Sequence, residues 1–175
     1  MSDNHLALTG ATIGAGGAIM VGLADRHVPA ERLPSLIEGL SSGDAGPAVA
    51  AVTTAPPADD LGDHRAWIDA CYAGTDLGVI IGRLTAHPAP EARAAAEEIA
   101  GKSPTSLAVT LRSLRTAARL SGLRAALAQE YRLSAALLRL PDLAEGIRAQ
   151  IIDKDRRPRW SPVPPNLVDD LFRRS

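Results

Sequence analysis

Hydrophobic positions recur at helical spacing along most of this chain. After Leu33, apolar side chains follow at three, four and seven residues, which places them on one face of a helix over residues 30–40. Comparable patterns predict eight further helices, at residues 18–24, 45–52, 63–72, 76–86, 90–100, 104–118, 121–140 and 142–153. Residues 166–173 read as a last amphipathic turn or two. The sequence therefore predicts a chain of short helices with little strand.

One predicted helix, residues 121–140, is apolar on two sides. Leu123, Leu127, Tyr131 and Leu138 share one side, and Leu120, Leu133, Leu137 and Leu140 share the other. Such a helix usually lies between neighbours in a core or at a subunit interface. Self-association through its apolar faces is therefore expected.

Local signals also predict where two helices begin. Ser103 followed by Pro104 fits an N-cap and a first helical position, where the missing proline N–H costs nothing. Asp142 and Glu145, three residues apart before an apolar stripe, read as a capping box. Both signals predict a helix that begins next to the polar side chain.

The best linker candidate is the stretch TTAPPADDLG, residues 53–62, which is rich in Pro and Asp and lacks periodicity. It separates residues 1–52, expected to hold the end of a core region and the first helices, from a C-terminal helical region at 63–160. Residues 161–175 form a tail. The sequence is thus divided into four parts.

A glycine-rich stretch, TGATIGAGG at residues 9–17, matches the opening of a nucleotide-binding turn. A dinucleotide loop needs a preceding strand, a long following helix and a second strand that ends in an acidic residue. Here the strand would be about four residues long and the helix about two turns. The favoured interpretation is a helix that ends at Thr9-Gly10 and is followed by a flexible turn.

Composition narrows the classes of function. The net charge is −1, which excludes a basic field for nucleic acid or for an anionic membrane surface. The single cysteine, Cys71, cannot form a disulfide within the chain, so we expect a cytoplasmic protein. Four scattered histidines, His5, His27, His64 and His87, lack metal-ligand spacing, and no metal site is predicted.

Several stretches of the sequence resemble a known family in their order and spacing. They are LALTG at 6–10, AIMVGLADRHVP at 18–29, KSPTSLAVTLR at 102–112, EYRLS at 130–134 and DLAEGIRAQIIDKDRRPRW at 142–160. Together they are similar to the C-terminal part of the 3-hydroxyisobutyryl-CoA hydrolase family, within the enoyl-CoA hydratase/isomerase (crotonase) superfamily. The resemblance covers nearly the whole chain and is weakest between residues 43 and 100.

This resemblance implies a mostly α fold, the helical C-terminal portion of a crotonase-like (ClpP/crotonase) fold from which the N-terminal β-β-α spiral core is missing. In the family that core supplies the oxyanion-holding N–H groups and the catalytic carboxylates, so no catalytic residue is assigned to this chain. We expect a truncated protein, inactive alone, from a family that hydrolyses an acyl-CoA thioester in valine degradation. The alternative is a non-catalytic helical partner that completes a separately encoded N-terminal half.

The resemblance also suggests where coenzyme A would bind. No covalently bound cofactor is implied; the CoA moiety belongs to the substrate, and acyl-CoA is an expected ligand only if the N-terminal half is supplied. Related enzymes bring C-terminal residues near the nucleotide end of CoA, so Lys154 and Arg156 are the candidate CoA contacts. The alternative is a solvated helix end in which residues 153–156 pair internally.

Two further residues carry alternative interpretations. Glu145 is either a general acid or base, or a capping-box carboxylate, and it can pair with Arg148 one helical turn later. Cys71 stands beside Trp67 and Ile68 on an apolar face, which predicts a buried and inert thiol.

Overall fold

The structure, a computed structural model, describes residues 2–173 apart from the side chain of Ser42. Most of these residues lie in helices, and their only extended pairing is an isolated antiparallel bridge between His27 and Thr54. The α helices are α1 (Ser2–Thr9), α2 (Ala15–Met20), α3 (Leu33–Ser42), α4 (Ala45–Val52), α5 (Arg65–Cys71), α6 (Leu77–Ala86), α7 (Pro90–Ala100), α8 (Pro104–Ala117), α9 (Leu123–Leu137), α10 (Pro141–Ile147) and α11 (Leu167–Arg173). Shorter turns are η1 (Ala30–Arg32), η2 (Asp60–Gly62) and the π-helical turn η3 (Arg148–Ile152).

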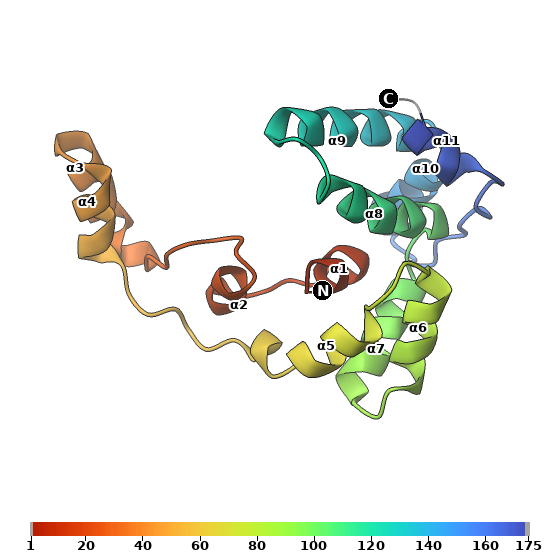
Figure 1. Ribbon diagram of the computed structural model, residues 1–175, viewed down its shortest axis with the longest axis horizontal. Helices are drawn as coiled ribbons and strands as arrows, with labels where there is room; N and C mark the ends of the chain where they lie inside the picture. Colours follow the sequence, from red (N-terminus) through yellow and green to blue (C-terminus); the bar gives the residue numbers. More distant parts are fainter. Residues whose placement is uncertain (1, 174–175) are drawn as a thin grey trace. The chain divides into compact units, whose positions relative to one another are not determined.

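The chain divides into two compact units. One comprises residues 1–11 and 67–175, and the other residues 12–66. In the first unit α1 packs against α7 and α8, and α6 packs against α7 (Figure 1). In the second unit α3 and α4 form an antiparallel hairpin (Figure 1). Helix α2 packs against η2.

The core of the first unit is aliphatic, with one tyrosine at its centre. Its fully buried large side chains come from α1, α5 and its end, α6 and α7: Leu8, Ile68, Tyr72, Ile80, Leu84 and Ile99. Small alanines of α7, Ala92, Ala95 and Ala96, are also buried and allow the close approach of neighbouring helices. The core of this unit is therefore built mainly from aliphatic side chains.

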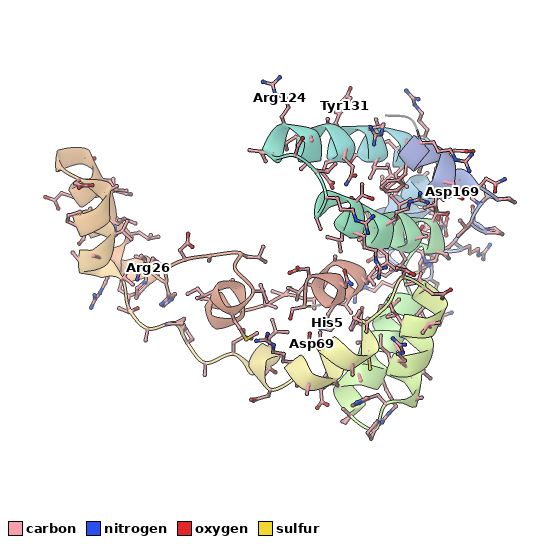
Figure 2. The ribbon with its side chains drawn as sticks, viewed as in Figure 1. His5, Arg26, Asp69, Arg124, Tyr131 and Asp169 are labelled. Carbon is pink, nitrogen blue, oxygen red and sulfur yellow. The ribbon has the colours of Figure 1, made fainter. Side chains whose placement is uncertain are left out.

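The prediction of a helix with two apolar sides holds for α9, but only one side is covered. Leu133 is buried and faces the interior of its unit. The other side is exposed at Leu123, Leu127, Tyr131 and Leu138. Figure 2 shows Tyr131 projecting from α9 on the side away from α8. Whether this side mediates self-association stays a prediction.

Several predicted helix boundaries are confirmed. Helices α4 and α7 have the predicted limits, and α8 begins at Pro104. The hydroxyl of Ser103 accepts the N–H of Ser106 at 3.1 Å, which is the predicted cap. Gly10 ends α1 in the left-handed region at φ 67°, as the glycine C-cap requires.

The last helix is held to α8 by a polar and aromatic contact. Arg112 of α8 pairs with Asp169 of α11, and its guanidinium lies 4.9 Å from the centre of the Phe172 ring. The predicted amphipathic turn at residues 166–173 is therefore a real helix, packed on its unit. Among residues 2–173, no helix combines the length and the apolarity needed to cross a bilayer.

The predicted fold class needs one correction. The mostly α class fits the structure, but the description of the chain as a remainder from which an N-terminal β-β-α spiral core is missing is wrong. The helices of the first unit bury a hydrophobic cluster of their own, in which six large side chains, five aliphatic and one tyrosine, are less than 2% exposed. A helical unit with its own hydrophobic core is therefore no evidence that a β-β-α spiral core is missing.

Candidate functional site

The glycine-rich stretch is built around a carboxylate from the same unit. The backbone N–H of Gly14 donates to Oδ2 of Asp59 at 3.0 Å, and the N–H of Leu61 donates to Oδ1 at 3.0 Å. The N–H of Leu61, followed by those of Gly14 and Gly17, holds the pKa of the Asp59 carboxyl below its ordinary value. The anion held by these glycines is therefore a side chain of the chain itself.

Close approach explains why glycine is needed here. A Cβ atom on Gly16 would stand 2.6 Å from the carbonyl oxygen of Pro57, and one on Gly17 would stand 2.7 Å from Asp59. The nucleotide-binding alternative thus fails, as the missing strand context indicated. The helix predicted at residues 18–24 has the wrong limits, because α2 runs from Ala15 to Met20 and begins within the glycine stretch.

A buried polar contact joins α8, α10 and the segment that follows η3. The hydroxyl of Ser103 donates to Asp142 at 2.5 Å, and the other carboxylate oxygen of Asp142 accepts the N–H of Ser161 at 2.9 Å. Ser103 and Asp142 are 6% and 7% exposed. The predicted capping box is wrong: α10 begins one residue earlier, at Pro141, and Asp142 binds a serine 39 positions away.

The densest set of charges in the described chain surrounds Arg148, at the start of η3. Its guanidinium donates to both carboxylate oxygens of Glu145, at 2.8 and 2.9 Å. It also donates to Asp153 at 2.5 Å and to Asp155 at 2.8 Å. We call Glu145, Arg148, Asp153 and Asp155 the Arg148 cluster. The predicted pairing of Glu145 with Arg148 is confirmed.

The protonation of Glu145 argues against acid or base chemistry at this residue. Its side chain binds Arg148 through two hydrogen bonds and also accepts the N–H of Arg159 at 2.7 Å. These bonds, led by those from Arg148, lower the pKa of Glu145 to about 2. A carboxylate this acidic is a weak proton acceptor near neutral pH, and its role is structural. It is not a capping-box residue either.

Lys154 and Arg156, the candidate CoA contacts, lie within the loop that the Arg148 cluster closes. Both residues are exposed, and neither has an ion-pair partner within residues 2–173. Both have left-handed backbones, with φ values of 56° and 54°. The internal pairing considered for residues 153–156 does not occur, because Asp153 and Asp155 both bind Arg148.

An apolar hollow of about 610 Å³ is lined by residues that precede and follow this loop in the sequence, among them Ile151 and Trp160. It is bounded by the start of α8, the end of α9, α10 and η3, and Trp160 forms part of its wall. Its apolar lining comes from Leu137, Leu138, Leu140, Leu143, Ile147 and Ile151, and its polar edge from Lys102, Ser103, Asp142 and Gln150. The indole N–H of Trp160 donates to the carbonyl of Gly101 at 2.9 Å and fixes that wall.

The sequence profile described as "Enoyl-CoA hydratase/isomerase" matches residues 3–172, almost the whole chain. The chain belongs to the enoyl-CoA hydratase/isomerase family. Among curated relatives, it is 33% identical to the mitochondrial 3-hydroxyisobutyryl-CoA hydrolase of Gallus gallus, covering 95% of this chain and 46% of that protein. It is also 33% identical to the corresponding Homo sapiens protein, covering 90% and 44%. The resemblance found in the sequence is thus confirmed.

Solved structures of this family match the helices closely. A carnitinyl-CoA dehydratase from Mycobacterium thermoresistibile matches with a TM-score of 0.87 and 41% identity, over 97% of this chain and 50% of that one. An enoyl-CoA hydratase from Rhodobacter sphaeroides matches with a TM-score of 0.83 and 40% identity, over 96% and 50%. The chain spans about half the length of these relatives, and its helices follow their fold over the matched part.

Sequence reasoning about this enoyl-CoA hydratase/isomerase family member missed two polar contacts, one partly buried and one buried. The Nδ1 atom of His5 lies 2.9 Å from the hydroxyl of Tyr72, and the ring of His5 stands edge-on to that of Trp67. Gln129 of α9 donates to the carbonyl and hydroxyl of Ser113 in α8. Neither residue forms a motif with its sequence neighbours, so no local signal could have marked it.

The remaining single-residue predictions fare better in this family member. Cys71 is 2% exposed, and burial raises the pKa of its thiol. His27 makes a structural contact, with Nδ1 3.1 Å from the Thr54 hydroxyl. The expectation of no metal site stays a prediction; residues 2–173 contain no group of three His, Cys, Asp or Glu side chains placed to hold a metal ion.

Proposed function

We propose that this chain provides an acyl-CoA-binding helical part of a 3-hydroxyisobutyryl-CoA hydrolase-type protein. The observation that supports it is the pair of exposed cations Lys154 and Arg156, which have no ion-pair partner among residues 2–173. Residues on both sides of their loop in the sequence, Ile151 and Trp160, line the apolar hollow. Its relatives are a 3-hydroxyisobutyryl-CoA hydrolase, a carnitinyl-CoA dehydratase and an enoyl-CoA hydratase, so each of them is named for an acyl-CoA. Because these proteins share acyl-CoA in their names but differ in the reaction named, the similarity supports acyl-CoA binding more directly than it supports hydrolysis.

The chemistry of the two features matches the two ends of such a ligand. Coenzyme A carries phosphate groups at its nucleotide end, and cationic side chains form strong charge-assisted hydrogen bonds to phosphate. The hollow of about 610 Å³ has the size and apolar lining typical of small-molecule sites. Lys154 and Arg156 would bind phosphate, and the hollow would take an apolar part of the ligand.

The proposed reaction of the whole protein is hydrolysis of a short branched β-hydroxyacyl-CoA thioester, a step of valine degradation. That reaction needs donors for the oxyanion and a carboxylate that activates water or attacks the carbonyl. Glu145 and Asp142 are both committed to hydrogen bonds within the chain, so we assign no catalytic residue. The chain alone is proposed to be inactive, in the cytoplasm.

The alternative is a non-catalytic helical partner for a separately encoded polypeptide. Its support is the coverage: the chain spans about half of each relative, and the partner would correspond to the unmatched half. Release of free CoA from 3-hydroxyisobutyryl-CoA, measured with and without that polypeptide, separates the two ideas. Hydrolysis by this chain alone would contradict both.

Replacing Lys154 and Arg156 together with glutamine is expected to lower the affinity for CoA about tenfold, since each exposed ion pair contributes up to about 1 kcal/mol. Isothermal titration calorimetry with CoA measures the change. Arg119→Gln with Arg124→Gln is the matched control, because it removes two exposed cations elsewhere. Equal losses in the two double variants would show only a general effect of charge and would contradict the proposed contacts.

A further inference from the structure

The loop that carries Lys154 and Arg156 has an unfavourable backbone conformation, which needs stabilising contacts from neighbouring residues. Left-handed φ angles are uncommon for residues other than glycine, and two occur here within three positions. The loop follows η3, a π-helical turn, and such turns are rare and often occur at functional sites. A specific set of contacts must therefore fix this conformation.

Arg148 provides those contacts. Besides Glu145, Asp153 and Asp155, its guanidinium donates to the carbonyl of Arg157 at 3.1 Å, so it reaches five acceptor oxygens in all. These acceptors come from α10 on one side and from residues 153–157 on the other. An arginine has five N–H donors in a planar fork, and here all parts of the fork are used.

The partners of Arg148 fix the loop further. Oδ1 of Asp155 accepts the N–H of Arg157 at 2.8 Å, and Oε1 of Glu145 accepts the N–H of Arg159 at 2.7 Å. The N–H of Arg156 donates to the carbonyl of Ala149 at 3.1 Å. The two exposed cations thus stand between fixed points on both sides.

We infer that Arg148 is a positioning residue, which binds Asp153 and Asp155 so that Lys154 and Arg156 are presented together to a phosphate group of CoA. This inference rests on the proposed function, because it assumes that these two cations contact the ligand. Arg148 itself is engaged by carboxylates and does not touch the phosphate. Arg148 offsets only part of the negative charge of the three carboxylates that it binds, so its contribution is mainly to the geometry of the loop.

Arg148→Lys tests the inference at constant net charge. A lysine ammonium is a compact point charge and cannot reach the same five acceptors, so the loop should lose its conformation. We expect the affinity for CoA to fall about tenfold, which is also the loss expected when both cations are removed. In the Arg148→Lys background, the added Lys154→Gln and Arg156→Gln changes should cost less than twofold, because the cations are no longer placed together.

Asp155→Asn gives a test in which two explanations predict opposite signs. This variant removes a negative charge beside the cations, so simple electrostatics predicts tighter CoA binding. A positioning role of Arg148 predicts that CoA binds about threefold more weakly, because the ion pair between Arg148 and residue 155 is lost from the Arg148 cluster. This variant also serves if Arg148→Lys fails to fold, which circular dichroism would reveal.

The possible outcomes separate the inference from the proposed function. The positioning role of Arg148 is overturned if the double glutamine change lowers the affinity for CoA equally with and without Arg148→Lys, or if Asp155→Asn binds CoA more tightly. The proposed contacts of Lys154 and Arg156 with CoA would still stand. If the double glutamine variant binds CoA as the unaltered chain does, the contacts and the positioning role are both overturned. The inference is supported if Asp155→Asn binds CoA more weakly, and if the double glutamine change costs much less affinity in the Arg148→Lys background than in the unaltered chain.

Discussion

Replacing Tyr72 with alanine should lower the free energy of unfolding of its unit by about 3–5 kcal/mol, the usual cost of removing a buried aromatic side chain. Tyr72 is 0% exposed, and its hydroxyl lies 2.9 Å from Nδ1 of His5. The variant would leave a cavity beside Ile68 and also leave the His5 ring without that partner. Burial raises the pKa of the Tyr72 hydroxyl, which therefore stays protonated and available for the bond.

Urea denaturation followed by far-ultraviolet circular dichroism measures this loss. The fit must allow two transitions, because the chain forms two compact units. Tyr131→Ala is the matched control, since the same side chain is removed from a position that is 79% exposed. Its effect should remain within about 0.5 kcal/mol. Similar losses in the two variants would contradict the assigned burial.

Gly16→Ala should destabilise the unit of residues 12–66 by about 1–3 kcal/mol, the range for an overpacked site. The added Cβ would stand 2.6 Å from the carbonyl oxygen of Pro57 and 3.0 Å from Cβ of Asp59. The backbone carbonyl cannot rotate away as a side chain can. Relief would require α2 to separate from the segment that holds the Asp59 carboxylate.

Gly82→Ala in α6 is the control with the opposite sign. A Cβ at Gly82 meets nothing within 4 Å, so alanine should stabilise its helix by up to about 1 kcal/mol through propensity alone. Amide hydrogen exchange over residues 12–66 and over α6 measures both effects in their own units. Stabilisation by both alanines would mean that the close approach to Pro57 is not present in solution.

The helices could be predicted from the sequence wherever a local signal set the boundary. Pro90 and Ser103-Pro104 start their helices as expected, because a proline at the first turn and a serine cap act within three residues. Asp142 carries an equally plausible local signal, yet its side chain binds Ser103. A partner 39 positions away changes the role of a residue without changing its local pattern.

The candidate site could be predicted only in part for the same reason. The spacing of Glu145 and Arg148 indicates a pair, and the structure contains it. Asp153 and Asp155 bind the same guanidinium because of η3 and of two residues with left-handed backbones. The spacing of apolar residues in the sequence predicts neither feature. Likewise, the glycines at 14–17 mark a close approach, but the partner, Asp59, lies more than 40 positions later.

The chain's two tryptophans, Trp67 and Trp160, both belong to the unit that contains residues 67–175. Trp67 is 7% exposed and stands edge-on to His5, whereas Trp160 closes one wall of the hollow through its bond to Gly101. Indole emission therefore gives two optical signals from a single unit. A chain that carries only Trp160 would report on ligand entry into the hollow, and one that carries only Trp67 would report on the melting of the core.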